Sequence, residues 1–526
     1  MKVLGISGRG PDAAAAVAVN GRIVAAVSEH SQRSATRRAL SPDGIPAAAT
    51  QACLDAAGLR LTDLDAVAHV SEAGVVATLE DDLHGLEDLP SHSVDALHAD
   101  ALQAAAFSAH AGTVLVCSSR PAALAPFEQQ DGVLVPGQLL AGADEIFSAA
   151  VSIAHALGLP ARDPYAELET LTNSAEPDFL DGFAKAMIWN GRGVVVHQDR
   201  LHDLLTSLGE TLPLNDAASI NVRAQHARKA VATSFTCRLA DLFCDAARSV
   251  REQTRGQQLL LAGGLFSSAR LSSEIRDRAG NDMAMAALPE LPGRAIGAAL
   301  VASYEQAMPQ SHLALGPAFS NADVKRVLDN CRLDYVYEPD WSRILTRVSA
   351  MLQQGKVVAW FQGALSFGPR SLGTRSVLCD PSNRYARHNI NEFYRQVSID
   401  EPLPLVFAPA AARMAGAGDA RFPVFDIVVD AAWRGKLVSA LDTRQRVRVH
   451  TLAPHQAPEL QSLLDFHYAQ TGVPGLIETN LSAPGEPAAC TPREAIRTTY
   501  ASAIDALIIG NFVLMKDHWL LRSDVR

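Results

Sequence analysis

The first 29 residues, MKVLGISGRGPDAAAAVAVNGRIVAAVSE, decide how the chain begins to fold. Residues 3–7 form an apolar run typical of a strand, and residues 8–13 then fit the dinucleotide-binding pattern G-x-G-x-x-A. That pattern requires a helix next. Residues 14–19 and 22–27 are instead two apolar runs joined by Asn20-Gly21, the strongest short signal for a two-residue hairpin turn. The segment therefore predicts a strand followed by an antiparallel hairpin, which is not the topology of a dinucleotide-binding domain.

A strand, a glycine turn and a hairpin begin the proteins of the actin/Hsp70/sugar-kinase superfamily, in which the first turn approaches the phosphates of a nucleotide. Beyond this start the periodicity predicts helices at residues 41–59, 94–110, 143–157 and 218–255, with short strands between them. Residues 258–264, QLLLAGG, predict a buried strand that runs into a double glycine. Gly263 and Gly264 would let backbone N–H groups approach a nucleotide, and the alternative is a tight strand–helix turn.

Composition excludes several classes of protein. The chain has 526 residues, 48% of them hydrophobic and 20% charged, with a net charge of −11, which is ordinary globular material and a poor general binder of nucleic acid or anionic membranes. The seven cysteines are scattered without a CxxC pair, which excludes a zinc ribbon and a disulfide framework. There is no P-loop, no H-E-x-x-H and no G-x-S-x-G. With neither a signal peptide nor a transmembrane run, we expect a cytoplasmic protein.

The hydrophobic pattern loosens over residues 307–337, and we place a domain boundary there. Residues 341–354 then predict a helix and residues 356–361 a strand, at the start of a second α/β unit. The predicted organisation is an N-terminal domain at residues 1–315, a linker at 316–340 and a C-terminal domain at 341–526. No internal repeat is visible in the sequence.

The densest polar cluster is SFGPRSLGTRSVLCDP, residues 366–381. Arg370 and Arg375 lie five residues apart beside a glycine-rich turn, and guanidinium groups bind phosphate or carboxylate in a bidentate manner. The pattern therefore favours an anion site over a solvated loop. Further positive groups follow at Arg395 and at Arg444, Arg446 and Arg448, which alternate along an apparent strand and so project from one face. Those three form either part of the anion site or a basic face paired with acids elsewhere.

The cluster resembles the signature of the NodU/CmcH/TobZ carbamoyltransferase family, usually G-R-M-E-F-G-P-R-A-L-G-N-R-S-I-L-A-D-P. Further motifs of that family recur in order at the following positions: 389–391 (NIN), 407–409 (FAP), 471–474 (TGVP), 485–487 (GEP), 491–495 (TPREA) and 507–511 (LIIGN). At the other end, residues 3–7, the hairpin with Glu29, 261–264 and 296–299 fit the same order. The resemblance covers essentially the whole chain.

The resemblance implies an N-terminal TsaD-like domain of the actin/Hsp70 (ASKHA) class and a C-terminal YrdC-like α/β domain. It implies that the YrdC-like domain converts carbamoyl phosphate and ATP, with Mg²⁺, to carbamoyl-adenylate. The TsaD-like domain, which usually holds Fe(II), would then pass the carbamoyl group to a hydroxyl of a specialised metabolite, as in antibiotic biosynthesis. A carbamoyl carbonyl needs a good leaving group, and arginines stabilise the charge that develops on phosphate oxygens.

Carried over residue by residue, the resemblance implies catalytic roles in the C-terminal half for Arg370, Arg375 and Arg395, where Arg395 replaces the usual lysine. It implies binding roles for Ser376, Asn391, Arg446 and Asn480, together with Gly263 and Gly264 of the N-terminal half. The family's N-T-S-F-N appears here as Glu478-Thr-Asn480-Leu-Ser, which is a departure.

The N-terminal half departs further. Of the family's H-H-x-x-H only the first histidine remains. It is His98, which we take as a catalytic candidate, and Leu102 stands in the place of the last histidine. The family's aspartate before the G-A-A motif falls at about Leu291, and the asparagine after L-A-G-G is Ser267. Leucine cannot bind iron, so we expect no bound metal and no family Fe(II).

Two classes of function remain open. One is an ATP- and carbamoyl-phosphate-dependent carbamoyltransferase that acts on a small-molecule acceptor, with no nucleic-acid or membrane partner. Its variant is a divergent member with altered acyl or carbamoyl transfer that lacks the usual iron. The other class is a non-catalytic partner scaffold. The retained arginine cluster favours the enzyme, because a scaffold has no physical need for a phosphate-binding loop. The sequence names neither the acceptor nor an oligomeric state.

Overall fold

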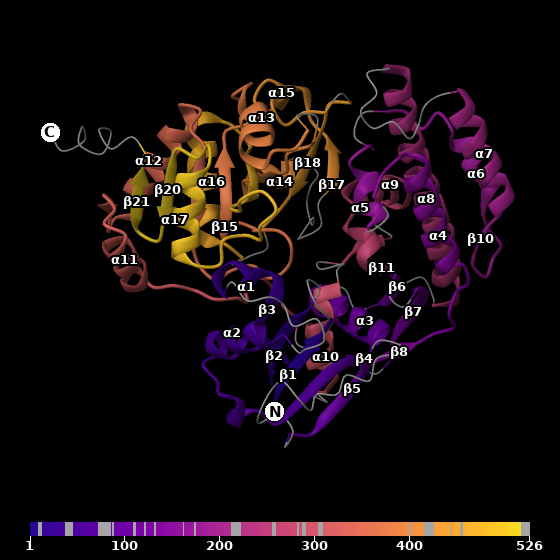
Figure 1. Ribbon diagram of the computed structural model, residues 1–526, viewed down its shortest axis with the longest axis horizontal. Coiled ribbons are helices and arrows are strands. Elements are labelled where there is room, and N and C mark those ends of the chain that lie inside the picture. The colour runs from indigo at the N-terminus through magenta and orange to yellow at the C-terminus, as the bar shows by residue number, and fades with distance from the viewer. Residues whose placement is uncertain are drawn as a thin grey trace.

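The structure is a computed structural model, drawn in Figure 1. It describes residues 1–8, 13–36, 46–71, 86, 89–108, 112–119, 122–130, 133–160, 163–172, 175–211, 222–254, 259–280, 283–286, 291–302, 309–398, 401–414, 425–442, 444–452 and 456–516.

The chain begins with a five-stranded sheet of order β3-β2-β1-β4-β5. The first three strands are antiparallel, and β4 and β5 run parallel to β1. Asn20 and Gly21 have φ values of 50° and 71°, so the predicted hairpin and its turn are confirmed. The strands are β1 (Lys2–Ser7), β2 (Ala14–Val19), β3 (Arg22–Ser28), β4 (Ala66–Ser71) and β5 (Ser91–Asp95); the helices against them are α1 (Glu29–Thr36), α2 (Ala47–Ala57), α3 (Ala96–Ala106) and α10 (Arg294–Ala302).

A second sheet repeats this topology, in the order β12-β11-β6-β7-β8. Strands β6, β7 and β8 are again antiparallel, and β11 and β12 are parallel to β6. Two sheets of the same topology confirm the actin/Hsp70-like class, and they form a repeat of strand order. The strands are β6 (Thr113–Ser119), β7 (Ala122–Gln130), β8 (Val133–Pro136), β11 (Leu259–Ala262) and β12 (Met283–Met285). The repeat is invisible in the sequence because strand order depends on backbone pairing and not on particular side chains.

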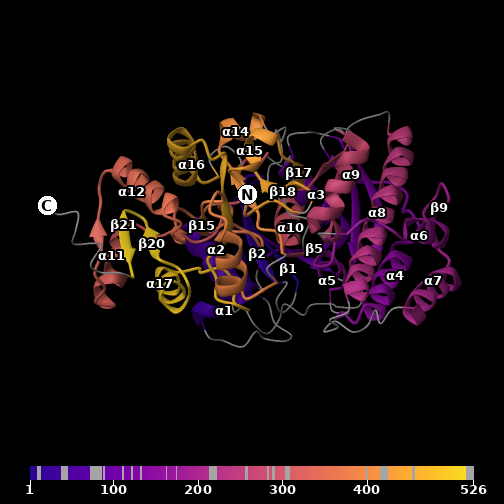
Figure 2. The same ribbon diagram turned by 90° about the horizontal axis from the view of Figure 1, so that it is seen from above.

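Helices cover the second sheet, with α8 packed against α9 (Figure 2). The expected helix at 218–255 is one long element, α8 (Val222–Gln253), whose buried face includes Phe235 and Phe243. The other elements here are α4 (Ala143–Ala156), α5 (Pro164–Glu169), α6 (Leu180–Ala186), α7 (Gln198–Thr211), α9 (Ala269–Ala279), β9 (Met187–Trp189), β10 (Val194–Val196) and the short 3-10 turns η2 (Leu61–Asp63), η3 (Gly264–Ser267) and η5 (Leu291–Gly293). No helix in the described part of the chain is long and apolar enough to cross a membrane.

The C-terminal unit is built on a nine-stranded sheet of order β13-β21-β20-β14-β15-β19-β16-β18-β17. It appears in orange to yellow in Figure 1, beside α5 and α9 of the N-terminal half. The strands are β13 (Val336–Tyr337), β14 (Val358–Phe361), β15 (Arg375–Cys379), β16 (Leu405–Phe407), β17 (Phe425–Val428), β18 (Arg446–His450), β19 (Gly475–Asn480), β20 (Ala506–Ile509) and β21 (Phe512–Met515). The helices are α11 (Asn321–Asn330), α12 (Trp341–Gln353), α13 (Ala386–His388), the π-helix η6 (Asn389–Arg395), α14 (Pro409–Met414), α15 (Ala431–Arg434), α16 (Pro458–Thr471) and α17 (Pro492–Ala501).

The segment expected to be a linker, residues 316–340, contains both helix α11 and strand β13. Helix α11 begins at a capping box in which Ser320 and Asp323 exchange side-chain and backbone hydrogen bonds. Strand β13 pairs with β21 and so extends the nine-stranded sheet. The loose hydrophobic pattern arises because α11 buries only two side chains, Val324 and Leu328. The segment is therefore ordered structure; the domain limits drawn around it stay a prediction.

Candidate functional site

The first part of the polar cluster lies in the loop between the antiparallel strands β14 and β15, residues 362–374, and the rest includes strand β15 itself. Asn480 of β19 holds this loop with both ends of its amide: its Oδ1 accepts from the Ser371 N–H at 2.9 Å, and its Nδ2 donates to the Pro369 carbonyl at 2.7 Å. Gly373 has a φ of +83°, and a Cβ there would lie 2.7 Å from Ala457 Cβ. The loop is therefore fixed, and the predicted binding residue Asn480 acts on the loop itself.

Glu478, also on β19, anchors the same loop from beneath. Its Oε1 accepts from Ser376 Oγ and from the Gly373 N–H, each at 2.5 Å, and its Oε2 lies 2.5 Å from His450 Nε2. Burial alone favours the protonated carboxyl, but His450 and these donors outweigh it and hold the pKa of Glu478 below its usual range. The predicted binding residue Ser376 is thus a fully buried loop anchor. The sequence marked Glu478 only as a departure from the family motif.

Arg375 does not lie where the sequence predicted a phosphate-binding arginine. Its guanidinium is fully buried and donates to the carbonyls of Gln362 (2.8 Å), Thr374 (2.9 Å), Gly363 (3.1 Å) and Pro317 (3.2 Å). It also stacks over Phe361, with 3.7 Å from Cζ to the ring centroid. Burial lowers the pKa of Arg375 to about 9, so the group still carries its charge at neutral pH. The correction has a simple cause: Arg375 is the first residue of β15, and its side chain points into the protein rather than toward a ligand.

A cavity of about 310 Å³ lies between the two halves of the chain. Residues of α5 and η3 from the N-terminal half face the β14–β15 loop and strands β18 and β19 across it. Three arginines line it, together with one histidine and three glutamates. The lining residues are Ala166, Glu169, Thr170, Ser267, Ala269, Arg370, Ser371, Arg395, Glu401, Pro402, Pro404, Arg448, His450, Glu478, Thr479 and Asn480. Arginines that converge on one cavity suit an anionic ligand, such as a phosphate or an adenylate.

Arg370 and Arg395 reach this cavity from different elements. Arg370 comes from the β14–β15 loop, and its Nη2 lies 3.5 Å from the Ser267 carbonyl of the N-terminal half. Arg395 ends the π-helix η6, where it forms an ion pair with Glu401 and donates to Asn391 Oδ1 at 3.0 Å. Asn391 is fully buried and donates to the Glu401 carbonyl at 2.7 Å. The predicted binding residue Asn391 therefore orients Arg395 and does not line the cavity.

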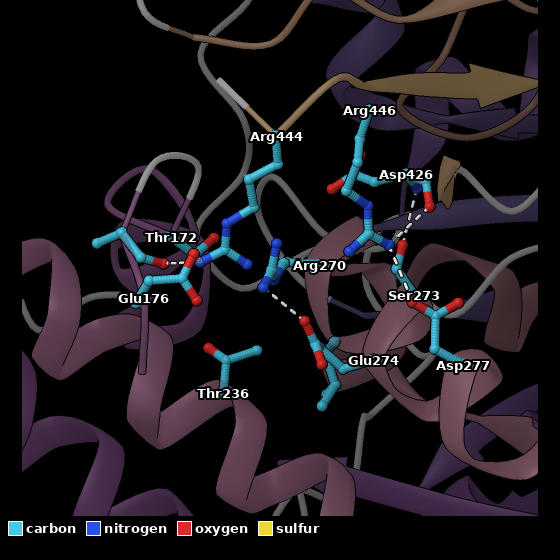
Figure 3. A network of polar contacts seen from close by, with 12 residues as sticks. Thr172, Glu176, Thr236, Arg270, Ser273, Glu274, Asp277, Asp426, Arg444 and Arg446 are labelled. Atoms are coloured by element: carbon cyan, nitrogen blue, oxygen red, sulfur yellow. Dashed lines mark hydrogen bonds and ion pairs between the residues drawn. The ribbon is translucent and has the colours of Figure 1, made fainter. Parts of the chain in front are cut away.

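Arg444 and Arg446 pair with acidic residues of the N-terminal half and so follow the second of the two alternatives. Figure 3 shows Arg444 directed at Glu176 and Arg446 directed at Asp277, both in the N-terminal half, at 3.1 Å each. The predicted binding residue Arg446 thus lies outside the cavity, in the contact between the halves.

Arg448 lines the cavity and so follows the first alternative, although the resemblance implied a binding role for Arg446 and not for Arg448. Its Nε donates to Asp426 Oδ1 at 3.0 Å, and its Nη2 lies 3.5 Å from Glu169 Oε1. Burial alone would lower the pKa of Arg448, but the carboxylates of Asp426 and Glu169 raise it above the usual value. The alternation along β18 was the available signal, since residues 446, 448 and 450 share one face.

The double glycine forms a tight turn at the end of β11. Gly263 has a φ of +114°, and a Cβ there would lie 1.9 Å from the Cys117 carbonyl oxygen of β6. Close backbone packing alone therefore requires glycine at 263. Gly264 begins η3, whose last residue, Ser267, lines the cavity. The pair positions that wall of the cavity, and neither glycine lines the cavity.

The described N-terminal residues near the family's histidine positions make other contacts. The His98 ring stacks on Phe127 with centroids 5.7 Å apart, and burial lowers the pKa of His98. Leu102 packs into the neighbouring apolar cluster, and Asp100 is held by Arg294, whose Nε and Nη2 donate to its carboxylate at 2.9–3.1 Å. Among the described residues, no three His, Cys, Asp or Glu side chains lie close enough together to hold a metal ion. His98 is also absent from the lining of the cavity.

Comparison with known proteins identifies the C-terminal region. Residues 349–516 match the family described as "Carbamoyltransferase C-terminus". Nodulation protein NolNO of Sinorhizobium fredii is 25% identical over 96% of this chain and 79% of its own length. Nodulation protein NolO of Bradyrhizobium diazoefficiens is 25% identical over 51% of each chain, and an uncharacterised protein of Synechocystis is 29% identical over 43% of this chain and 42% of its own. The chain thus spans about half the length of these last two relatives.

Among solved structures, full-length HypF in its phosphate- and nucleotide-bound form matches 58% of this chain and 47% of its own, with a TM-score of 0.37 and 12% identity. The sequence matches confirm the resemblance drawn from the motifs. The chain is similar to the NodU-type carbamoyltransferase family, and the match to the family described as "Carbamoyltransferase C-terminus" covers its residues 349–516.

Proposed function

We propose that this chain is an ATP-dependent carbamoyltransferase, and that the cavity between its two halves forms carbamoyl-adenylate from carbamoyl phosphate and ATP. The observation that supports this most directly is the convergence on one cavity of Arg370, Arg395 and Arg448, which all belong to the region that matches the family. Its acceptor would be a small molecule of a biosynthetic pathway.

The chemistry needs positive charge in that place. In the proposed sequence carbamoyl phosphate loses its phosphate to water and gives carbamate. A carbamate oxygen then bonds to the α-phosphorus of ATP, and the bond from that phosphorus to the pyrophosphate oxygen breaks. Negative charge grows on the phosphate oxygens in this step, where preorganised guanidinium groups stabilise it most. Arg395 is fixed by Glu401 and Asn391, so little reorganisation is needed at the moment of reaction.

The three glutamates of the cavity limit its net charge. Glu169 lies against Arg448 and Glu401 against Arg395, whereas Glu478 lies against His450. A bound polyphosphate would compete with these carboxylates for the arginines. Mg²⁺, the usual companion of ATP, would bind phosphate oxygens with one or two carboxylates, and Glu169 and Glu401 are the candidates in this cavity.

The test is carbamoyl-phosphate-dependent exchange of labelled pyrophosphate into ATP. We expect Arg370→Ala and Arg395→Ala to reduce the exchange by at least about 100-fold, since each removes a charge-assisted contact worth about 3 kcal/mol. Arg446→Ala is the matched control, because Arg446 lies on the same face of β18 but outside the cavity. Normal exchange in both cavity variants would refute the assignment, and equal losses in all three would indicate a loosened interface instead.

A second candidate is carbamoyl or acyl transfer that does without the family's iron. The observation that favours it is the contact between Arg294 and Asp100, together with a leucine where the resemblance implies a histidine ligand. We expect purified protein to contain little or no iron while it still exchanges pyrophosphate. Purified protein that retains one tightly bound iron ion per chain would overturn this candidate.

A further inference from the structure

A buried histidine, His450, lines the arginine-lined cavity, which is the cavity of about 310 Å³ bordered by Arg370, Arg395 and Arg448. Residues 446, 448 and 450 share one face of β18, and the last two of them border the cavity. The His450 side chain is only 3% exposed, so its two ring nitrogens need partners within the protein or in a ligand.

Glu478 is the partner of one of these nitrogens. Strand β16 lies between β18 and β19, and the two side chains meet across it, with His450 Nε2 2.5 Å from Glu478 Oε2. The other carboxylate oxygen of Glu478 is engaged by Ser376 Oγ and the Gly373 N–H. A carboxylate beside one ring nitrogen favours the tautomer in which that nitrogen carries the proton, and the other nitrogen then has a lone pair.

The nitrogen with the lone pair is His450 Nδ1. This atom is buried, and it has no hydrogen-bond partner among the residues that the structure describes. A buried polar atom rarely lacks a partner, so an exception in a side chain that lines a cavity indicates a partner that arrives with the ligand. Nδ1 can therefore accept a proton or a hydrogen bond from a molecule in the cavity.

The other charged groups of the cavity are less suited to accept a proton. Guanidinium groups are donors only, so the three arginines can stabilise charge on a phosphate but cannot activate water. Two of the three glutamates lie against arginines, Glu169 against Arg448 and Glu401 against Arg395, and Glu478 is occupied as described. His450 is thus the ionisable group of the cavity lining that combines a proton-accepting atom with no competing contact.

We propose that His450 is the general base for the hydrolysis of carbamoyl phosphate in this cavity. The inference rests on the proposed function, in which this hydrolysis supplies the carbamate. The water oxygen forms a bond to the carbamoyl carbon, and the bond from that carbon to the phosphate oxygen breaks. Phosphate leaves with the electron pair. His450 Nδ1 takes one proton of the water, the departing phosphate takes the other, and carbamate remains.

The experiment removes the base and keeps the rest of the cavity. His450→Gln retains an amide beside Glu478 but cannot take up a proton, and His450→Ala leaves space for added imidazole. His467→Gln is the matched control. His467 is also a buried histidine of the C-terminal unit beside a carboxylate, 3.3 Å from Asp380, but it does not line the cavity. Thermal unfolding of all three variants checks that the fold is kept.

Two readouts separate the two steps of the reaction. The first is release of labelled phosphate from carbamoyl phosphate in the presence of ATP. The second is pyrophosphate exchange with ammonium carbamate in place of carbamoyl phosphate, which bypasses the hydrolysis because carbamate is its product. We expect both His450 variants to lose at least about 100-fold in phosphate release and to keep carbamate-supported exchange within about threefold of wild type. Imidazole should restore phosphate release in His450→Ala, and the control should match wild type throughout.

Phosphate release that is unchanged in both His450 variants would overturn the inference. Equal losses of phosphate release and carbamate-supported exchange would also overturn it, because His450 would then maintain the cavity and not transfer a proton. A loss of the same size in His467→Gln would have the same meaning. Wild-type protein that exchanges pyrophosphate with neither carbamoyl phosphate nor carbamate gives a different result, because the proposed function itself then fails and the inference falls with it.

Discussion

Arg370 and Arg375 lie five residues apart in one motif, and their replacement should have opposite consequences. Arg370→Ala removes a half-buried side chain whose contact with the Ser267 carbonyl is 3.5 Å long. Loss of the Arg370 side chain should lower the free energy of unfolding by less than about 1 kcal/mol. The same change should abolish pyrophosphate exchange. Arg375→Ala removes the group that holds the loop from within, so we expect it to destabilise the C-terminal unit.

The size of the second effect follows from the contacts of Arg375. Four buried carbonyls lose their donor, at about 1 kcal/mol each at the low end, and the void left by so large a side chain adds about 3 kcal/mol. Against this, the charge no longer has to be buried. The pKa of Arg375 is about 9 instead of 12.5, so burial of its charge costs about 5 kcal/mol, at about 1.4 kcal/mol per pH unit. The net destabilisation is at least about 2 kcal/mol, and it rises to about 6 kcal/mol when each carbonyl takes a middle value of about 2 kcal/mol.

The assay is urea unfolding followed by a signal of the C-terminal unit, such as the fluorescence of Trp360, which is fully buried. With an m-value of about 2 kcal/mol per M, the midpoint of Arg375→Ala should fall by about 1–3 M, and that of Arg370→Ala by less than about 0.5 M. An unchanged midpoint for Arg375→Ala would refute the anchoring argument. A midpoint that falls equally in both variants would show that the two arginines are equivalent, as their spacing in the sequence first indicated.

Two further predictions concern the contact between the halves and the turn after β11. The carboxylate of Asp426 is buried against Arg448, and because its pKa lies below the unfolded value of 3.8, its stabilising effect is complete above about pH 4 and is lost as the pH falls through the folded pKa. Asp426→Asn should therefore lower the free energy of unfolding in urea at pH 7 by about 3 kcal/mol. The difference in this free energy between the variant and wild type should be smaller at pH 3.5. A difference that does not depend on pH would contradict this. Gly263→Ala should lower the apparent Tm by about 6–12 °C, since strain and the clash with the Cys117 carbonyl cost about 3 kcal/mol or more, whereas Gly209→Ala, with open space around it, should not.

The fold could be predicted where the signal was local. Asn20-Gly21 determines its own turn, so the opening hairpin followed from two residues. The second sheet has the same topology, but its strands pair across more than a hundred residues of chain, as β6 does with β11. The hydrophobic periodicity of one segment does not indicate with which distant strand that segment pairs. Helix α11 was missed for a different reason: Ser320 and Asp323 form a readable capping box, but its buried face is only two residues wide.

The sequence predicted that the site binds an anion, but it did not predict which side chains line the site. The motif indicated an anion site, and Arg370 and Arg395 do line one cavity. Arg375 shares their residue type, yet the pleat of β15 turns it inward, and only the packing of the sheet decides that. Arg448 could not be chosen over Arg446 from alternation alone, because both project from the same face. The positions of Glu169 and Asp277 in the N-terminal half separate the two, and these positions depend on how the halves meet.

The anchoring of the β14–β15 loop determines how Arg370 is presented to the arginine-lined cavity. Arg375 fixes one end of the loop, while Glu478 and Asn480 fix its middle from β19, so the loop cannot tilt on its own. The opposite wall of the cavity, however, comes from α5 and η3 of the N-terminal half. A ligand in this cavity therefore contacts both halves, which gives a physical reason for the two halves to occur in one chain.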